Sequence, residues 1–298
     1  MTPNPQGRPH FADPPGRAWR RDAPGVAETW EGPTPFLSVV IPAKDEAEGL
    51  PRLMAEIAAA LRPLCVRTEP RQTRLGGFEV ILVDDGSTDD TPRVLRDLEV
   101  DFPELRPVRL RANVGQSAAT AVGFRAARGS WIATLDADLQ NDPADLAALW
   151  RRLPGHDAVL GWRRERRDKW SRRVVSRWAN RARNAVLGQT IRDTGCSVRI
   201  FRRDLALRLP LFHGSHRFLG PLLLREGADV AQIPVNHRAR PHGASHYNFR
   251  NRSFRVVVDL LGVAWLMRRP LRYEVVEPGP SVPAPFLRLA ATPIREAS

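Results

Sequence analysis

Three short apolar runs, each followed directly or within a few residues by acidic residues, constrain the fold of this chain more than any other feature. The runs span residues 36–41, 78–83 and 131–135. Continuous apolar runs of this length are typical of parallel strands that are buried on both faces. Predicted helices at 48–61, 91–98, 115–127 and 143–153 alternate with the runs and with two weaker strand candidates at 107–110 and 157–161. The alternation predicts an α/β fold with a mostly parallel, Rossmann-like sheet flanked by helices.

The acidic residues that follow the runs form three groups. They are Asp45 with Glu46, Asp84 with Asp85, and Asp136 with Asp138. In open sheets of this kind, ligands bind at the carboxyl ends of the strands. One acidic loop there is an ordinary turn or helix cap, but three at equivalent strand ends predict one shared acidic crevice. Because gathered carboxylates repel each other, a metal ion, hydrogen-bond donors or arginines must balance them.

Asp136 and Asp138 flank a small residue, Ala137, at the end of the third run. Carboxylates in this arrangement suit Mg²⁺ or Mn²⁺, which bridge protein oxygens to a diphosphate. A metal ion there would stabilise the charge that develops on a departing nucleoside diphosphate. An isolated Asp-x-Asp is more often a simple turn, and the neighbouring acidic groups favour the metal site here.

Charge and composition narrow the classes of function. The 298 residues carry a net charge of +13, which fits either a general solvated surface or a face that binds anions. Nucleic-acid binding is disfavoured, because no recognised module and no aromatic stacking platform accompanies the basic residues. Two cysteines provide neither a disulfide framework nor zinc-ligand spacing.

The two ends of the chain differ from its centre. Residues 1–35 lack the ~7–15-residue apolar stretch of an export signal and are expected to form a disordered extension. A basic and apolar helix is expected at 251–272, followed by a flexible tail at 273–298. Its apolar part, 256–267, would rise only ~18 Å as a helix, short of the ~30 Å hydrocarbon core of a membrane. It is expected either to lie in the membrane interface or to pack on the core.

Seven segments of the chain match motifs of a known family. They are 40–46, 83–89, 113–115, 135–140, 161–163, 193–196 and 237–247. Together they resemble the family 2 glycosyltransferases of GT-A fold over residues 36 to about 271. The pattern Arg240, Gly243, Ser245 and Tyr247 is similar to the polyprenyl-phosphate branch, typified by dolichol-phosphate mannosyltransferase. The predicted catalytic domain spans residues 36–250.

The resemblance implies roles for the matching residues. The nucleoside pocket would be lined by Pro42, Lys44, Glu46, Val83 and Asp85, with Asp84 bracing the loop. Ribose, diphosphate and metal would meet Asp136, Ala137 and Asp138, and the metal ligands would be Asp138 and Gln140. Phosphates would contact Arg163, Arg240 and His246, and the catalytic set would be Asp136, Asp138, Arg163 and Arg240. The family usually has asparagine at position 45 and lysine at 246, so His246 replaces a permanent cation by one that titrates near neutral pH.

The resemblance implies an inverting, metal-dependent transfer of a hexose to a polyprenyl phosphate (undecaprenyl or dolichyl), from a donor of the GDP-mannose or UDP-glucose type. A lipid phosphate is already anionic and needs no general base, but it needs cations that hold it. The candidates are Arg163, Arg164, Arg166, Arg167, Arg238 and Arg240, although a solvated surface is favoured for Arg166 and Arg167.

Two other functions stay open. One is transfer to a polysaccharide, protein or small hydroxyl acceptor, which would require a general base, and the other is a non-catalytic protein that binds nucleotide sugars or anionic surfaces. The expected location is peripheral, at the cytoplasmic face of the membrane, with a separate membrane subunit as an alternative means of attachment.

Overall fold

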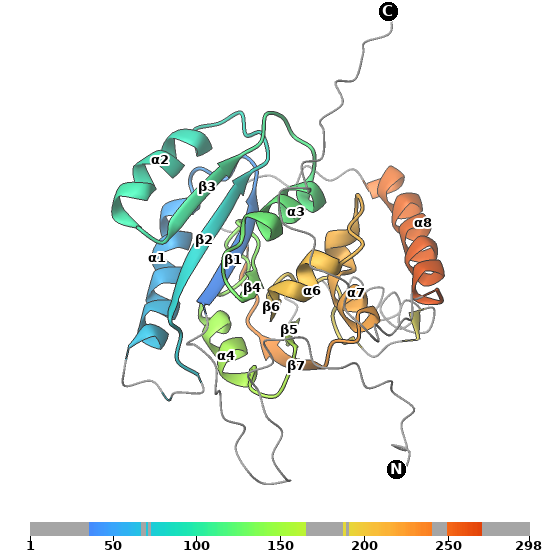
Figure 1. Ribbon diagram of the computed structural model, residues 1–298. Coiled ribbons are helices and arrows are strands. Elements are labelled where there is room, and N and C mark those ends of the chain that lie inside the picture. The colour runs from blue at the N-terminus through green and yellow to red at the C-terminus, as the bar shows by residue number, and fades with distance from the viewer. Residues whose placement is uncertain are drawn as a thin grey trace, which may run out of the picture.

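The computed structural model describes residues 36–66, 70, 73–164, 187–188, 191–239 and 249–269, and these contain a seven-stranded sheet. The strand order is β3-β2-β1-β4-β6-β5-β7, and every pairing is parallel except those of β6 with β4 and β5 (Figure 1). The strands are β1 (Phe36–Ala43), β2 (Gly77–Asp84), β3 (Leu105–Arg109), β4 (Trp131–Thr134), β5 (Ala158–Arg163), β6 (Arg199–Arg202) and β7 (Val230–Val235). The predicted α/β class is confirmed, and β6 and β7 are strands that the sequence pattern did not reveal.

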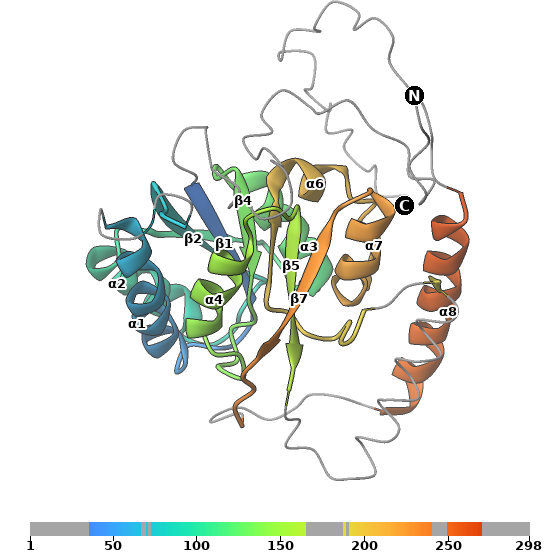
Figure 2. The same cartoon turned by 90° about the horizontal axis from the view of Figure 1, so that it is seen from below.

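Helices cover both faces of this sheet. They are α1 (Leu50–Leu61), α2 (Thr91–Asp101), α3 (Gln116–Ala126), α4 (Ala144–Arg152), α6 (Arg203–Arg208), α7 (Leu219–Arg225) and α8 (Phe249–Met267), with short 3₁₀ turns η1 (Arg62–Cys65) and η2 (Ser215–Arg217). Residues of α1, α2 and α4 pack on one face, and residues of α3, α6, α7 and α8 pack on the other (Figure 2).

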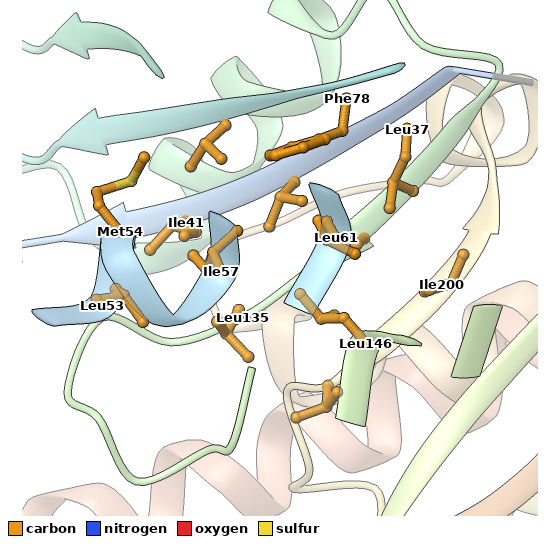
Figure 3. Close-up of a cluster of buried hydrophobic side chains, with 14 of the residues drawn as sticks. Leu37, Ile41, Leu53, Met54, Ile57, Leu61, Phe78, Leu135, Leu146 and Ile200 are labelled. Carbon is orange, nitrogen blue, oxygen red and sulfur yellow. The ribbon is translucent and has the colours of Figure 1, made fainter. Parts of the chain in front are cut away.

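Alternating side chains of the central strands divide the core in two. In β1, Val39 and Ile41 join the cluster under α1 and α4, whereas Val40 between them joins the cluster under α3. Successive residues of a strand point to opposite faces, so a continuous apolar run serves both clusters. Figure 3 shows the first cluster, in which Leu53 and Ile57 of α1 lie against the sheet. This packing fixes the carboxyl ends of β1, β2 and β4 as neighbours.

The last described helix, α8, has two unlike faces. Val263 and Ala264 are buried against the cluster of α6 and α7, whereas Val258, Leu261 and Trp265 are 50%, 60% and 59% exposed. α8 therefore packs on the body of the protein and also presents an apolar stripe outward. None of the described helices combines the length and hydrophobicity that a membrane span requires.

Candidate active site

The three acidic loops lie side by side because the strands before them are neighbours in the sheet. β1 pairs with β2 on one side and with β4 on the other, and all three run parallel. The backbone N–H of Asp85 donates to Ala43 O at 2.8 Å, which joins the ends of β1 and β2. The loops that carry Asp45, Asp84 and Asp136 therefore start from the same edge.

Asp45 holds the first acidic loop against the second. Its Oδ1 accepts from the backbone N–H of Thr88 at 2.7 Å, and its Oδ2 accepts from Lys44 Nζ at 2.6 Å. The Lys44 hydrogen bond, followed by that of Thr88, lowers the pKa of Asp45 to about 2. The backbone of Asp45 has a positive φ of 54°, which is uncommon for a residue other than glycine. The departure from asparagine thus supplies a carboxylate that binds backbone and lysine, and Lys44, predicted for the nucleoside pocket, donates to it.

Asp84 and Asp85 stabilise the loops around the end of β2. Asp84 is fully buried, and its Oδ1 accepts from the backbone N–H of Ser87 at 2.8 Å. The two oxygens of Asp85 accept from the N–H groups of Val114 and Gly115 at 2.8 and 2.9 Å. Asp85 therefore fixes the segment that enters α3. Its predicted contact with a nucleoside stays a prediction.

The other residues predicted for the nucleoside pocket occupy different environments. Val83 is fully buried in the core, Glu46 is half-buried, and Pro42 lines a cavity beside Asp136. Gly86, just after Asp85, has a φ of 67°, and a Cβ there would lie 2.5 Å from the backbone of Asn113. The loop after β2 can therefore approach the 112–115 segment only because position 86 is glycine.

Asp136 and Asp138 occupy the loop after β4, and both are half-buried. Asp136 Oδ1 accepts from Gln116 Nε2 at 2.9 Å, and Ser197 is a further hydrogen-bond partner. Burial, and next the charge of Asp138, raise the pKa of Asp136. A cation at this pair would offset both effects and hold Asp136 ionised.

The loop after β4 offers a partial set of metal ligands. Asp138 Oδ1 accepts from the backbone N–H of Gln140 at 3.1 Å, and Ala137 is buried in the core beneath the loop. No group of three or more His, Cys, Asp or Glu residues in the described parts of the chain could hold a metal ion. Mg²⁺ in phosphate-transferring and related sites is commonly held by one or two carboxylates together with substrate phosphates and water. The residues present fit a metal ion of that kind.

Two of the predicted phosphate-binding arginines are engaged by carboxylates. Arg163 donates Nε and Nη2 to the two oxygens of Asp193 at 2.7 and 3.0 Å. Arg238 Nη1 lies 2.5 Å from Glu56 Oε2, and its Nη2 lies 2.8 Å from Asp142 Oδ1. Such ion pairs position the loops that carry the carboxylates. They also neutralise part of the charge of Arg163 and Arg238, which weakens the attraction of these arginines for a phosphate. The partner Asp193 belongs to a matched segment, but its pairing with Arg163 could not be inferred from spacing.

Arg238 also joins the loop after β4 to the segment that leaves β7. Its backbone N–H donates to Gln140 O at 2.8 Å, and Asn141 forms a β-bridge with His237. The backbone N–H of Asn236 donates to Asp145 Oδ2 at 2.8 Å. The start of the matched segment 237–247 is thereby held beside the predicted metal ligands. Four further predicted residues lie outside the described part of the chain, namely Arg166, Arg167, Arg240 and His246.

A cavity of about 250 Å³ opens beside Asp136, on the α3 side of the sheet. Its wall is formed by Val40, Pro42, Gln116, Thr120, Thr134, Leu135, Asp136, Gly195, Ser197, Arg199, His216, Arg217 and Leu219. Of these residues, only Pro42 and Asp136 were predicted from the sequence to belong to the site. The other residues come from β1, β4, α3, the segment that leads into β6, β6 itself, η2 and the start of α7, and only the fold brings them together at the end of β4.

Cys196, next to this cavity, is unsuited to nucleophilic catalysis. The thiol side chain is 1% exposed, and burial raises its pKa to about 11. A nucleophilic cysteine requires the thiolate, which is favoured by a lowered pKa. Cys196 is therefore a packing residue under the 193–197 loop.

Comparisons with known proteins agree on the family. Residues 38–209 match the family model described as Glycosyl transferase family 2. The dodecaprenyl-phosphate galacturonate synthase of Rhizobium johnstonii is 36% identical over 242 residues, which cover 79% of this chain and 68% of that protein. The undecaprenyl-phosphate 4-deoxy-4-formamido-L-arabinose transferase of Aeromonas hydrophila is 33% identical over 239 residues, which cover 80% and 69%.

Solved structures agree on the fold. Glucosyl-3-phosphoglycerate synthase from Mycobacterium tuberculosis, in complex with Mn²⁺ and UDP-glucose, aligns with a TM-score of 0.55 and 20% identity over 78% of this chain and 79% of that chain. The mannosyltransferase PcManGT from Pyrobaculum calidifontis, in complex with GDP-Man and Mn²⁺, aligns with a TM-score of 0.55 and 21% identity over 80% and 66%. The family match covers more than half of the chain, and the predicted resemblance is confirmed. This chain therefore belongs to glycosyl transferase family 2 and is a glycosyltransferase.

Proposed function

We propose that this enzyme transfers a hexose-type sugar from a nucleotide-sugar donor to a polyprenyl phosphate, with inversion at the anomeric carbon. The proposed acceptor rests on the names of two relatives, which are 36% and 33% identical to this chain. Both names contain a polyprenyl phosphate, although the sugars that they contain differ. The shared feature of these relatives is thus the lipid phosphate. The sugar is not fixed by the similarity.

The donor diphosphate is proposed to bind at Asp136 and Asp138, where the loop after β4 meets α3. Gln116 orients Asp136, and the backbone N–H of Gln140 orients Asp138, so both carboxylates are held before a ligand arrives. A bound Mg²⁺ or Mn²⁺ would supply charge stabilisation for the departing nucleoside diphosphate. The chain itself contributes the fixed orientation of these two carboxylates and the buried Ala137 between them, which anchors the loop to the core.

The acceptor phosphate oxygen is proposed to attack the anomeric carbon directly. A phosphate monoester is anionic at neutral pH, so no side chain has to remove a proton from it. The described site fits this chemistry because Cys196 is held as a thiol and Asp85 and Asp45 are bound to backbone N–H groups. Arg240 and His246 are proposed as phosphate-binding cations.

Membrane attachment is proposed to use the outer face of α8. Asp259, the acidic residue within its apolar run, lies toward the protein body, where its Oδ2 is 3.9 Å from Arg217 Nη1. The outward stripe of Val258, Leu261 and Trp265 is therefore uninterrupted by that charge, and the exposed Arg268 and Arg269 follow it. An apolar stripe with basic residues suits the interface of an anionic membrane. This supports a peripheral location at the cytoplasmic face.

A transfer assay tests the proposal. The purified enzyme is incubated with Mg²⁺ or Mn²⁺, a panel of labelled UDP- and GDP-sugars, and undecaprenyl phosphate, with undecaprenol as the matched acceptor that lacks the phosphate. We expect a labelled, organic-extractable product with the phosphate and none with the alcohol. Label that appears only in a soluble glycan or protein would instead favour a hydroxyl acceptor, and donor binding without any turnover would favour a non-catalytic binding protein.

A further inference from the structure

The cavity beside Asp136 has the size and position for the sugar of the donor. This reading rests on the proposed donor site at Asp136 and Asp138. In a nucleotide sugar the transferred ring is attached to the diphosphate, so it must lie next to the residues that hold that diphosphate. The cavity of about 250 Å³ shares Asp136 in its wall. Pockets for drug-sized ligands measure ~300–1,000 Å³, so this one suits a single sugar ring.

Arg199 is a buried cation in the wall of this cavity. It is 4% exposed at the start of β6, where Ala133 and Thr134 of β4 pair antiparallel with it and its neighbour. A guanidinium has five N–H donors. Within the described parts of the chain, Arg199 makes one hydrogen bond, from Nη2 to Thr194 O at 3.2 Å, and no ion pair. A buried cation with so few acceptors is unfavourable until an anion or other acceptor joins it.

The two acidic residues whose charges act on Arg199, Asp136 and Asp193, also have other partners. Both oxygens of Asp193 accept from Arg163, and Oδ1 accepts also from the backbone N–H of Gly195 at 3.1 Å. Asp136 accepts from Gln116 and belongs to the proposed diphosphate site. Burial lowers the pKa of the Arg199 guanidinium, and the charge of Asp136 opposes that lowering. When a cation binds at Asp136, Arg199 loses much of that compensation.

Residues of η2 in the cavity wall add hydrogen-bond donors. Ser117 Oγ accepts from the backbone N–H groups of Gly214 at 3.0 Å and His216 at 3.3 Å. Its own proton is therefore donated to His216 Nδ1, 2.8 Å away. This assignment leaves the proton of a neutral imidazole on Nε2, so His216 is a donor on its second nitrogen. Arg217, next along η2, brings a second guanidinium to the same wall.

We propose that this cavity binds the sugar of the donor and that Arg199 pairs with a carboxylate on that sugar, so that the enzyme transfers a hexuronic acid in preference to a neutral sugar. The planar guanidinium matches the two oxygens of a carboxylate, which a hydroxymethyl group cannot replace. A site built for such a group disfavours the neutral analogue because its buried donors are then unpaired. Arg199 is thus a specificity-determining residue.

Matched donors test this without any mutation. UDP-galacturonate is compared with UDP-galactose, and GDP-mannuronate with GDP-mannose, because each pair differs only at C6. For the nucleotide that the enzyme accepts, we expect kcat/KM for the uronate to exceed that for the neutral sugar by about tenfold or more, since hydrogen bonds to charged groups contribute ~1.5–3 kcal/mol. Equal use of both donors, or preference for the neutral one or for a formamido-pentose donor, would overturn the proposal.

Variants then locate the preference. Arg199→Gln is expected to lower kcat/KM for the uronate about 10- to 100-fold more than kcat/KM for the neutral donor, and Arg199→Lys should restore part of the preference. Arg202→Gln is the matched control, because Arg202 lies on the same strand but its Nε donates to Asp204 outside the cavity. An unchanged uronate preference in folded Arg199→Gln would contradict the assignment. So would a rise in KM for polyprenyl phosphate with the donor preference intact.

Equilibrium dialysis separates this proposal from the proposed function. Labelled donors are dialysed against the wild-type enzyme with Mn²⁺ and without acceptor. Tighter binding of the uronate than of its neutral partner supports the role of Arg199 even when no lipid product forms, in which case only the acceptor proposal fails. Equal dissociation constants for the two members of each pair would contradict the carboxylate site, whether or not transfer occurs.

Discussion

Carboxylates at the ends of β1 and β2 hydrogen-bond to the loops around them, whereas Asp136, after β4, lines the cavity. Asp45 and Asp85 accept from backbone N–H groups of residues 88 and 114–115, and Asp84 accepts from residue 87. Each bond satisfies a main-chain donor that would otherwise be exposed or unpaired in a tight turn. Asp136 and Asp138 are held by a side chain and by one N–H. The metal site is therefore expected at the last pair alone.

Replacing Asp138 should remove activity without unfolding the protein. We expect Asp138→Asn to lower kcat about a hundredfold or more, because an amide is a weaker ligand than a carboxylate for a hard cation. Thermal unfolding should change little, since the side chain is only half-buried. The measurement is turnover across a Mn²⁺ titration beside the surface variant Asp97→Asn. Near-wild-type turnover of Asp138→Asn would remove Asp138 from the metal role.

Asp145 should make stability depend on pH between about 4 and 6. Burial raises its pKa to about 6, with the Asn236 N–H opposing the shift and Asp142 adding to it. A folded pKa above the unfolded value of ~3.9 gives stability that is present below pH 4 and is lost as pH rises through about 6. Asp145→Asn should therefore stabilise the protein at pH 7.5 by about 2 kcal/mol.

Urea unfolding at pH 4 and pH 7.5 measures this effect. The gain of Asp145→Asn over wild type should be present at pH 7.5 and disappear at pH 4, whereas the exposed Asp101→Asn should show no such dependence. A constant difference between the two pH values would contradict the raised pKa.

At the scale of elements, Glu79 of β2 links four segments at the sheet end opposite the active site. It accepts from Ser38 Oγ of β1 and the backbone N–H of Arg128 after α3, both at 2.7 Å, and it pairs with Arg106 of β3. Burial opposes its ionisation, but these donors outweigh burial, and its pKa is lowered. Its contribution to stability is therefore present above the unfolded pKa and lost as pH falls through the folded value.

Removing this carboxylate should destabilise the sheet. We expect Glu79→Gln to lower the free energy of unfolding by about 3 kcal/mol, because it leaves buried donors and Arg106 without their anion. Glu104→Gln, which breaks a more exposed pair with Arg62, should cost no more than about 1 kcal/mol. Chemical denaturation of the two variants measures the two free energies of unfolding. If both variants lose the same amount of stability, Glu79 does not have the proposed role in joining the strands.

Sequence patterns predicted the β1, β2 and β4 segments because their apolar runs are continuous, and they predicted the helices between them because these are long enough to show a helical apolar periodicity. β6 has four residues and begins and ends with arginine, so its pattern carries no signal of a buried antiparallel strand. The acids at the strand ends were also predictable, but their partners were not, since Asp45 and Asp85 bind groups 29 to 44 residues away. Arg199 and His216 were not predicted either, because β6 and η2, which bring them to the cavity, are too short to show a sequence pattern.

On the scale of the whole molecule, charge and the outer face of α8 act together. The chain carries a net charge of +13, and α8 stands at one side of the molecule (Figure 2). Val258, Leu261 and Trp265 form the exposed apolar stripe of this helix. Arg269 lies over the ring of Trp265, with the guanidinium carbon 5.3 Å from the ring centre. A tryptophan beside arginines is well suited to the headgroup region.

Vesicle binding tests this arrangement. The protein should sediment with vesicles that contain anionic lipid, and Leu261→Ser with Trp265→Ser should weaken binding at least about tenfold, because two exposed apolar side chains are lost. Val100→Ser is the control, since Val100 is 84% exposed on α2, far along the chain from α8. Undiminished binding of the α8 variant would place the membrane contact elsewhere.

The mass spectrum of the lipid product tests glycosyl transfer to a lipid phosphate most directly. The proposed reaction predicts a polyprenyl phosphate that has gained one sugar residue and contains a single phosphorus, with one nucleoside diphosphate released for each product. A lipid with two phosphorus atoms and release of a nucleoside monophosphate would contradict it, because the enzyme would then transfer a phosphosugar.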